Sequence, residues 1–344
     1  MATSVPSSHL PVFFFHGLTG NPGEAVNLER VLTANGRALV ALSFCPSESS
    51  VLALRKQIPM AIAQIREVVA SDERFQNGYV FIGHSQGGMM ARAVVEEMDD
   101  HQVHTLISMA GAQNGVFYGP QPEDAAPMQG LLSLSGFSMQ PFPTAIFDFG
   151  TYQDESDSTS LRGKVQRAFA QLGLDQPELH EQFSFINLGW FPARETWLAS
   201  NPFLPMINNV NKCEPGDVQA LEDKERRKRN FLKLKAAHFF ASPGDGIAAP
   251  WQNSVFGRYS EVDSLDEIVT KFESLKMLDM RETEEYQGDT FGLKTLEERG
   301  ALFIHVVPDV PHCGWITDGP LADDPAKTCE FQDVFDKYIL PALP

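Results

Sequence analysis

The chain has 344 residues, of which 43% are apolar, and it carries a formal net charge of −18 at pH 7. This composition is typical of a globular protein with a sizeable core, and the acidic charge argues against nucleic acid as a partner, because a phosphate backbone needs a basic surface. No apolar run approaches the roughly 20 residues that a membrane helix needs, and the four cysteines lack the spacing of metal ligands. We therefore expect no integral membrane segment, no metal and no cofactor.

A short apolar run at residues 10–15 predicts a buried strand near the N-terminus. It is followed by a glycine-rich turn, residues 16–23, that begins His16-Gly17-Leu18. In one class of serine hydrolases a His-Gly turn after an early strand supplies a backbone donor to the oxyanion, and by position that donor is the N–H of Leu18. A plain glycine-rich loop is the alternative. For His16 itself we favour a structural role over a catalytic one.

The next segments alternate between helical and extended patterns. Residues 25–34 and 51–71 are predicted to be helices, and residues 38–42 a strand between them. The second helix is the better defined, because apolar residues recur there at the three- and four-residue spacing of one helix face.

The rest of the chain is organised around residues 79–88. An apolar run predicts a strand, the segment from residue 87 to 95 predicts a helix, and Gly83-His84-Ser85-Gln86-Gly87 lies between them. This is the G-x-S-x-G pattern of a nucleophile elbow. A glycine-rich packing turn is the alternative.

The chemistry of an elbow explains its glycines. A serine on a sharp turn is held in strained geometry, and a Cβ two residues to either side would collide with the opposite arm of the turn. The turn lifts the Ser85 hydroxyl clear of the sheet and leaves the Gln86 N–H at a helix N-terminus, where it can donate to an oxyanion. His84 is expected to pack rather than to catalyse.

Residues 103–110 predict the next strand, and strands that alternate with helices imply a mostly parallel central sheet with helices on both faces, as in α/β hydrolases. From residue 115 to 212 the alternation stops, although this segment is too apolar for a disordered linker. We interpret residues 115–212 as a lid-like insertion over the active site that forms the substrate pocket, within a single domain spanning residues 1–344.

The parallel pattern resumes after the insertion. Helices are predicted at residues 217–235 and 331–340, and strands at residues 236–241 and 301–307. Residues 265–278 are predicted to be mostly helical. The basic run within the first of these helices, residues 224–229, is interpreted as a solvated helix face.

A serine hydroxyl needs a histidine to take its proton, and the histidine needs an acid to fix its tautomer. In α/β hydrolases these residues follow successive strands in the order serine, acid, histidine. Asp245 follows the strand at residues 236–241, and His312 follows the last strand. Ser85, Asp245 and His312 are therefore predicted to form a catalytic triad.

Each assignment has a rival. Asp309 is close to His312 but lies on the histidine's own loop, which is the wrong place for the acid. His305 is a second late histidine, but it falls inside a predicted strand. Cys313 beside His312 could suggest thiol chemistry; with Ser85 available, we interpret it as a packing residue.

Several segments resemble those of the palmitoyl-protein thioesterases, α/β hydrolases that remove fatty acyl groups from cysteine thioesters. They span most of the chain, and those after the elbow are more specific than the elbow itself. In chain order they are residues 16–18 (H-G-M in the family), 83–88 (G-x-S-Q-G-G), 108–117 (S-x-G-G-Q-x-Q-G-V-F), 201–209 (FL-x-x-IN), 256–259 (F-G-x-Y) and 291–294 (L-G-L-K). The family's usual cysteines around the insertion are missing here.

The resemblance implies that Ser85 is the nucleophile, Asp245 the acid and His312 the base, with the N–H groups of Leu18 and Gln86 as the oxyanion hole. It implies an S-acylated protein or peptide, or an acyl-CoA-like thioester, as substrate, and a lysosomal or secreted location. The N-terminus lacks a secretory signal pattern, so a cytoplasmic location is the alternative. The rival functions are an oxygen-ester lipase or carboxylesterase, and a non-catalytic protein that binds a lipid or a partner.

Overall fold

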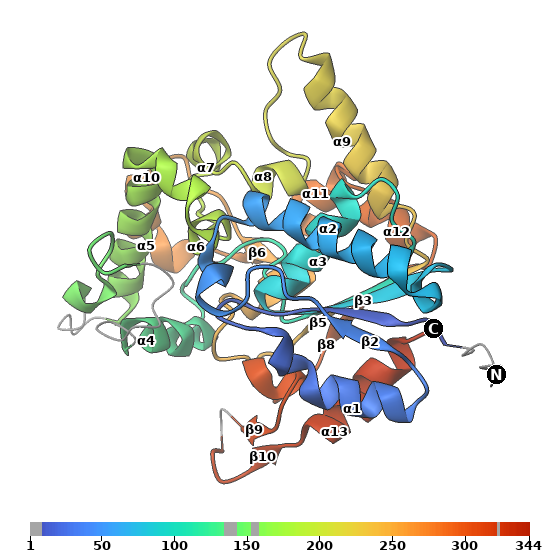
Figure 1. The fold of residues 1–344 in the computed structure, drawn as a ribbon. Coiled ribbons are helices and arrows are strands. Elements are labelled where there is room, and N and C mark those ends of the chain that lie inside the picture. The colour runs from blue at the N-terminus through green and yellow to red at the C-terminus, as the bar shows by residue number, and fades with distance from the viewer. Residues whose placement is uncertain (1–8, 134–142, 153–157, 322–323) are drawn as a thin grey trace, which may run out of the picture.

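Six parallel strands form the centre of the protein (Figure 1). The structure, a computed structural model, describes residues 9–133, 143–152, 158–321 and 324–344. In spatial order the strands are β2 (Leu39–Ala41), β1 (Val12–Phe15), β3 (Tyr79–His84), β4 (Val103–Met109), β5 (Ala236–Ala241) and β8 (Leu302–Val306). Every neighbouring pair is parallel, which confirms the predicted sheet.

The first strand illustrates why the sheet has two cores. Side chains alternate between the two faces of a strand, and all four residues of β1 are fully buried. Phe13 and Phe15 belong to the hydrophobic cluster on one face of the sheet, whereas Val12 and Phe14 belong to the cluster on the other. A strand buried on both faces reads as a continuous apolar run, as this one does.

Helices cover both faces of the sheet, as predicted (Figure 1). The larger cluster lies under α2 (Leu54–Ser71), α3 (Gln86–Glu97), α9 (Val218–Phe231) and α12 (Leu293–Glu298). The smaller one lies under α1 (Val26–Ala34) and α13 (Phe331–Val334). No helix among the described residues combines the length and apolar character needed to cross a membrane.

The segment 115–212 contributes helices beside the sheet (Figure 1). They are α4 (Ala125–Ser133), α5 (Ser158–Asp175), α6 (Ser184–Asn187), α7 (Arg194–Ser200) and α8 (Leu204–Ile207). A third hydrophobic cluster joins this segment, through Tyr118, Met128 and Val165, to Ala249 in the loop after β5. Residues 134–142, from the middle of the apolar stretch 128–149, lie outside the described residues.

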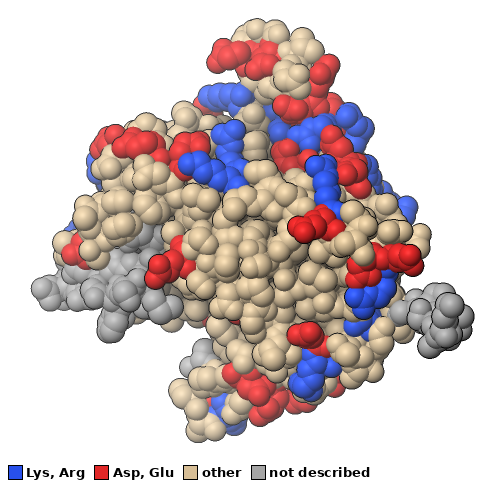
Figure 2. Space-filling model, viewed as in Figure 1, with Lys and Arg blue, Asp and Glu red and all other residues tan. Residues whose placement is uncertain are grey.

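The basic run of α9 is less exposed than predicted. Figure 2 shows acidic and basic side chains side by side over the part of the surface that α9 occupies. Arg226 and Arg227 pair with Glu97, and Lys228 pairs with Asp289. Arg227 is only 4% exposed. Part of the run therefore attaches α9 to its neighbours instead of facing water.

The prediction that residues 265–278 are mostly helical is wrong only at the end of this segment. The helix α10 (Leu265–Thr270) stops early, and β7 (Met277–Leu278) then pairs antiparallel with β6 (Arg258–Tyr259). Two-residue strands are too short to show a period in the sequence. Other short elements were missed for the same reason: α11 (Glu284–Gln287), β9 (Gly319–Pro320) and β10 (Thr328–Cys329).

Candidate active site

The connections of the sheet place the site between two strands. The strand β1 lies between β2 and β3, so the chain leaves β1 in one direction and, from β3 onward, proceeds in the other. Ligands of open parallel sheets bind at such a switch point, beyond the carboxyl ends of the strands. The turn that starts at His16 follows β1, and Ser85 follows β3.

Ser85 has the strained backbone of a nucleophile elbow. Its φ of 55° and ψ of −131° lie in a region that side-chain-bearing residues rarely adopt. A Cβ at Gly83 would lie 2.3 Å from the carbonyl oxygen of Gly87, across the turn, as expected. A Cβ at Gly87 would lie 2.1 Å from the carbonyl oxygen of Phe15. The second glycine thus avoids the end of β1 and not the opposite arm of the turn.

The side chains of Asp245 and His312 meet although 67 residues separate them. The Nδ1 atom of His312 lies 2.9 Å from Oδ1 and 3.0 Å from Oδ2 of Asp245. The backbone N–H of His312 also donates to the Asp245 carbonyl, at 2.8 Å. Because a carboxylate can only accept, Nδ1 carries the proton and Nε2 is left as the basic nitrogen.

Backbone groups hold the carboxylate in place. The N–H groups of Ile247 and Ala248 donate to Asp245 Oδ1, at 3.0 and 2.6 Å. Asp245 and His312 are 3% and 6% exposed, so water competes little for their contact.

Ser85 and His312 line one cavity of about 490 Å³. No hydrogen bond joins Ser85 Oγ to the imidazole among the described residues, and such contacts often tighten only when substrate binds. The other lining residues come from the end of β3, from the loops after β1, β5 and β8 and from the segment 115–212: Gly17, Leu18, Thr19, Glu24, His84, Tyr118, Pro127, Gly130, Phe185, Gly246, Ile247, Cys313 and Ile316.

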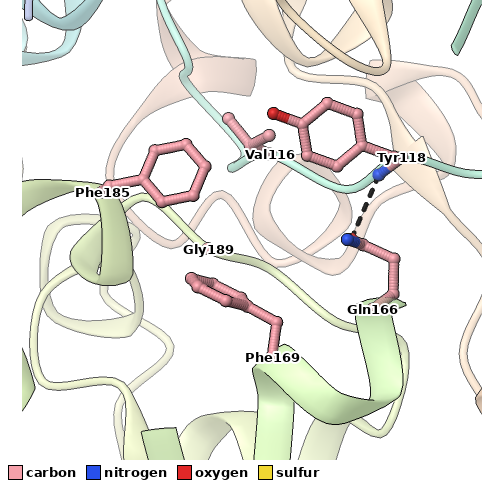
Figure 3. Close-up of a pocket in the computed structure, with 6 residues that line it drawn as sticks. All are labelled: Val116, Tyr118, Gln166, Phe169, Phe185 and Gly189. Carbon is pink, nitrogen blue, oxygen red and sulfur yellow. Dashed lines mark hydrogen bonds between the residues drawn. The ribbon is translucent and has the colours of Figure 1, made fainter. Parts of the chain in front are cut away.

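A much smaller void of about 10 Å³ is shown in Figure 3. Tyr118 and Phe185 line both spaces, and the side chains around the void are largely apolar, as Figure 3 shows for Val116 and Phe169. The rings of Phe169 and Phe185 meet edge to face, with centroids 5.6 Å apart. The large cavity and the void thus adjoin at Tyr118 and Phe185.

In the His16 turn, the N–H groups on either side of Leu18 have acceptors. The N–H of Gly17 donates to Glu24 Oε2 at 3.4 Å, that of Thr19 to Ser50 Oγ at 2.6 Å, and that of Gly20 to the Gly17 carbonyl at 3.1 Å. Within the part of the chain that the structure describes, the N–H groups of Leu18 and Gln86 have no such partner. These are the two donors that the sequence proposes for the oxyanion hole.

His16, His84 and His305 make structural contacts. His16 Nε2 lies 2.9 Å from the Phe44 carbonyl oxygen, and its ring stacks on Phe44. His84 Nε2 donates to the backbone carbonyl of His312, and burial lowers the pKa of His84 to about 3, so its ring stays neutral. His305, inside β8, stacks on Phe240 and contacts His238.

Asp309, the rival acid, and Cys313 are close to His312 in sequence, but neither has the properties of a triad residue. Asp309 is exposed and has no hydrogen bond to His312 among the described residues. Cys313 lines the cavity, but burial, helped by the charges of Glu24 and Asp245, raises the pKa of its thiol. A raised pKa disfavours the thiolate that a cysteine nucleophile needs.

Sequence reasoning missed Glu24 and Ser50, whose neighbours in sequence give no sign of a role. Glu24 reaches the cavity from the turn after β1, and burial raises the pKa of its carboxyl group. Across the described residues there is no group of three or more His, Cys, Asp or Glu side chains that could hold a metal ion.

A family model described as palmitoyl protein thioesterase matches residues 11–312. The chain belongs to the palmitoyl protein thioesterase family. All of the predicted site residues lie within the matched range, and membership of this family identifies the protein as a hydrolase.

Individual relatives are moderately similar. The human lysosomal thioesterase PPT2 is 26% identical over 313 residues, which cover 90% of this chain and 84% of that protein. The lysosomal thioesterase PPT2-B of Xenopus laevis is 29% identical over 239 residues, which cover 69% of this chain and 64%, just under two thirds, of the relative's own length. Among solved structures, the Bacillus licheniformis lipase BlEst2 aligns with a TM-score of 0.43 at 11% identity, covering 100% of this chain and 96% of the lipase.

Proposed function

We propose that this protein removes long-chain fatty acyl groups from S-acylated cysteines or related acyl thioesters through an acyl-enzyme on Ser85. The observation that carries the proposal is the bidentate contact of His312 with Asp245 at the wall of the cavity that Ser85 also lines. Family membership supports the reaction type.

The proposed mechanism follows from these contacts. Ser85 Oγ attacks the thioester carbonyl as Nε2 of His312 takes its proton, and the N–H groups of Leu18 and Gln86 stabilise the oxyanion. The C–S bond then breaks, and the imidazolium returns the proton to the thiolate. Water, deprotonated by His312, next attacks the acyl-serine and releases the fatty acid. Asp245 stays ionised and holds the imidazolium in place.

We propose that the segment 115–212 supplies the acyl-binding part of the pocket within one domain. Tyr118, Pro127, Gly130 and Phe185 line the cavity from this segment. They offer apolar or backbone surface, which suits a hydrocarbon chain and gives little to a charged group.

The names of the relatives support a lysosomal or secreted location, which we propose for this protein as well. Localisation of the full-length protein carrying a C-terminal fluorescent tag would test it. Diffuse fluorescence in the cytoplasm would contradict the proposal and favour the alternative.

The function is tested by comparing hydrolysis of palmitoyl-CoA with that of a matched palmitoyl oxygen ester on one purified sample, with Ser85→Ala as the control. We expect faster turnover of the thioester and none above background in the variant. Preference for the oxygen ester would favour a lipase or carboxylesterase. Binding of both without turnover would favour a non-catalytic binder.

A further inference from the structure

Ser50 is fully buried and connects the two loops that carry the proposed oxyanion donors. It is the second-last residue of the short 3-10 helix η2 (Ser47–Val51) and belongs neither to the triad nor to the lining of the cavity. Its hydroxyl accepts a hydrogen bond of 2.6 Å from the N–H of Thr19 and donates to the Ser47 carbonyl, also at 2.6 Å. A serine hydroxyl can do both at once, because it has one proton and two lone pairs.

The contact with Thr19 fixes the turn that follows β1. Thr19 is the residue after Leu18 and has a φ of 60°, in the left-handed region. A residue with a side chain stays in that conformation only where its surroundings hold it there. The peptide that joins Leu18 to Thr19 is thereby oriented, and the free N–H of Leu18 lies one peptide away.

The carbonyl oxygen of Ser50 makes the second connection. It accepts from Nε2 of Gln86 at 2.9 Å, and Gln86 is the residue whose backbone N–H is the other proposed donor. Gln57 Nε2 and Ser184 Oγ also donate to this oxygen, at 2.8 and 3.2 Å. Three donors on one buried carbonyl leave it little freedom to move.

We propose that Ser50 is a positioning residue that sets the distance between the two donors of the oxyanion hole. This inference rests on the proposed function. Oxyanion stabilisation depends on donors placed within tenths of an ångström of the developing charge. Ser50 controls both donors through separate groups, its hydroxyl through Thr19 and its carbonyl through Gln86.

The neighbouring serine offers a matched control. Ser49 belongs to the same 3-10 helix and its hydroxyl donates to the Pro46 carbonyl at 2.6 Å, but Ser49 is exposed and contacts neither Thr19 nor Gln86 through its side chain. Ser49→Ala and Ser50→Ala each remove a hydrogen bond from the serine hydroxyl to the carbonyl three residues earlier. Only Ser50→Ala also removes the acceptor of the Thr19 N–H.

The test measures thioester hydrolysis together with the binding of two inhibitors to the purified protein. A long-chain trifluoromethyl ketone adds to Ser85 and places an oxyanion in the hole, whereas the matching secondary alcohol does not. In Ser50→Ala we expect kcat/KM to fall about 10- to 100-fold, less than the roughly 100- to 1,000-fold loss typical of deleting a donor. The Ki of the ketone should rise by the same factor, whereas the Ki of the alcohol and the KM of the thioester should stay within about twofold of wild type. In Ser49→Ala all of these constants should stay within about twofold of wild type.

Ser50→Thr, which keeps the hydroxyl, should recover most of the lost activity. Gln86→Met removes the hydrogen bond from the Gln86 side chain to the Ser50 carbonyl. This variant supplies the same test if Ser50→Ala does not fold. The inference is overturned if Ser50→Ala matches Ser49→Ala, or if the ketone and the alcohol weaken together. A wild-type protein that binds the ketone no better than Ser85→Ala, and turns over no thioester, would instead overturn the proposed function.

Discussion

His84 Nε2 donates a hydrogen bond of 2.7 Å to the backbone carbonyl of His312, so the nucleophile elbow holds the loop that carries the proposed base. Asp245 fixes the imidazole of His312 through its side chain, and His84 fixes the backbone of the same residue. Burial, followed by the nearby charge of His312, lowers the pKa of His84 to about 3. A neutral His84 has one N–H, and it is used for this contact.

Replacing His84 by Phe should keep a ring in place but remove this donor. A buried carbonyl left without its partner typically costs about 1–3 kcal/mol of the free energy of unfolding. We expect such a loss in urea unfolding, together with a roughly tenfold lower kcat from a less ordered His312. His84→Gln can still donate to the same carbonyl, so its stability and its kcat should lie between those of wild type and His84→Phe. Equal kcat in all three proteins would contradict this role.

Ser85→Ala should abolish hydrolysis, because loss of a triad member typically lowers kcat about 10⁴–10⁶-fold. Its stability should match wild type, since alanine leaves the φ of 55° unrelieved. Ser85→Gly should be equally inactive yet more stable by about 1 kcal/mol, because glycine adopts this conformation without strain. Thermal unfolding of the three proteins compares them directly. More than a few per cent of activity left in either variant would exclude Ser85 as the nucleophile.

Asp245→Asn should lower kcat about 10³–10⁴-fold, because the imidazolium loses its orienting charge. Asp309→Asn is the matched control, since Asp309 is exposed and makes no contact with the imidazole of His312 among the described residues. We expect it to retain most of the wild-type activity. The reverse order of effects would show that the acid had been misassigned.

Local pattern predicts the elements of the sheet because each of them carries its signal within a few residues. The strand β3 and helix α3 flank the elbow as the apolar run and the glycines indicate. The proposal of Asp245 and His312 as acid and base came from chain order, which in this fold places both after strands. Their contact is consistent with that expectation.

Contacts between distant segments were not predictable in the same way. Ser50 and Gln86 are 36 residues apart, and nothing near either residue marks the other. Glu24 lines the cavity and accepts from the N–H of Gly17, seven residues earlier in the chain. The pair β6 and β7 depends on tertiary packing, which overrides the helical pattern of residues 265–278.

Asp124 should make stability depend on pH. Burial raises the pKa of its carboxyl group from 3.8 to about 6, against the hydrogen bonds from Tyr259 and Gly119. The folded protein then binds this proton more tightly than the unfolded chain. The resulting stabilisation is complete below about pH 4, is lost as the pH rises through 6, and amounts to at most about 3 kcal/mol.

Asp124→Asn mimics the protonated acid at every pH. Both hydrogen bonds fall on one carboxylate oxygen, so the amide oxygen can accept them in its place. Relative to wild type, the variant should therefore gain stability between about pH 4 and pH 7.5 in urea titrations. In Asp309→Asn, which changes an exposed carboxylate, stability should depend on pH as it does in wild type. A constant difference between Asp124→Asn and wild type across this range would refute the assignment.

The acyl chain is expected to occupy the cavity that Ser85, Tyr118 and Phe185 line. Each buried methylene contributes about 0.8 kcal/mol, so apparent affinity should rise with chain length until the cavity is full. Acyl thioesters from C4 to C14, assayed below their micelle limit, would show this as a rising profile that levels off. A flat or falling profile would remove the long-chain interpretation and favour a small-acyl esterase.

Phe185→Ala should move the point at which that profile levels off. Removing the ring should join the cavity to the apolar void beside Val116 and Phe169, and Ser85 does not line that void. Short substrates should therefore behave as in wild type, whereas longer ones should gain affinity in the variant alone. Phe303→Ala controls for the loss of a phenyl ring, because Phe303 lies on the exposed edge strand β8, 40% exposed. If Phe185→Ala weakened all chain lengths equally, Phe185 would support the fold of the segment 115–212 and would not limit the length of the acyl chain.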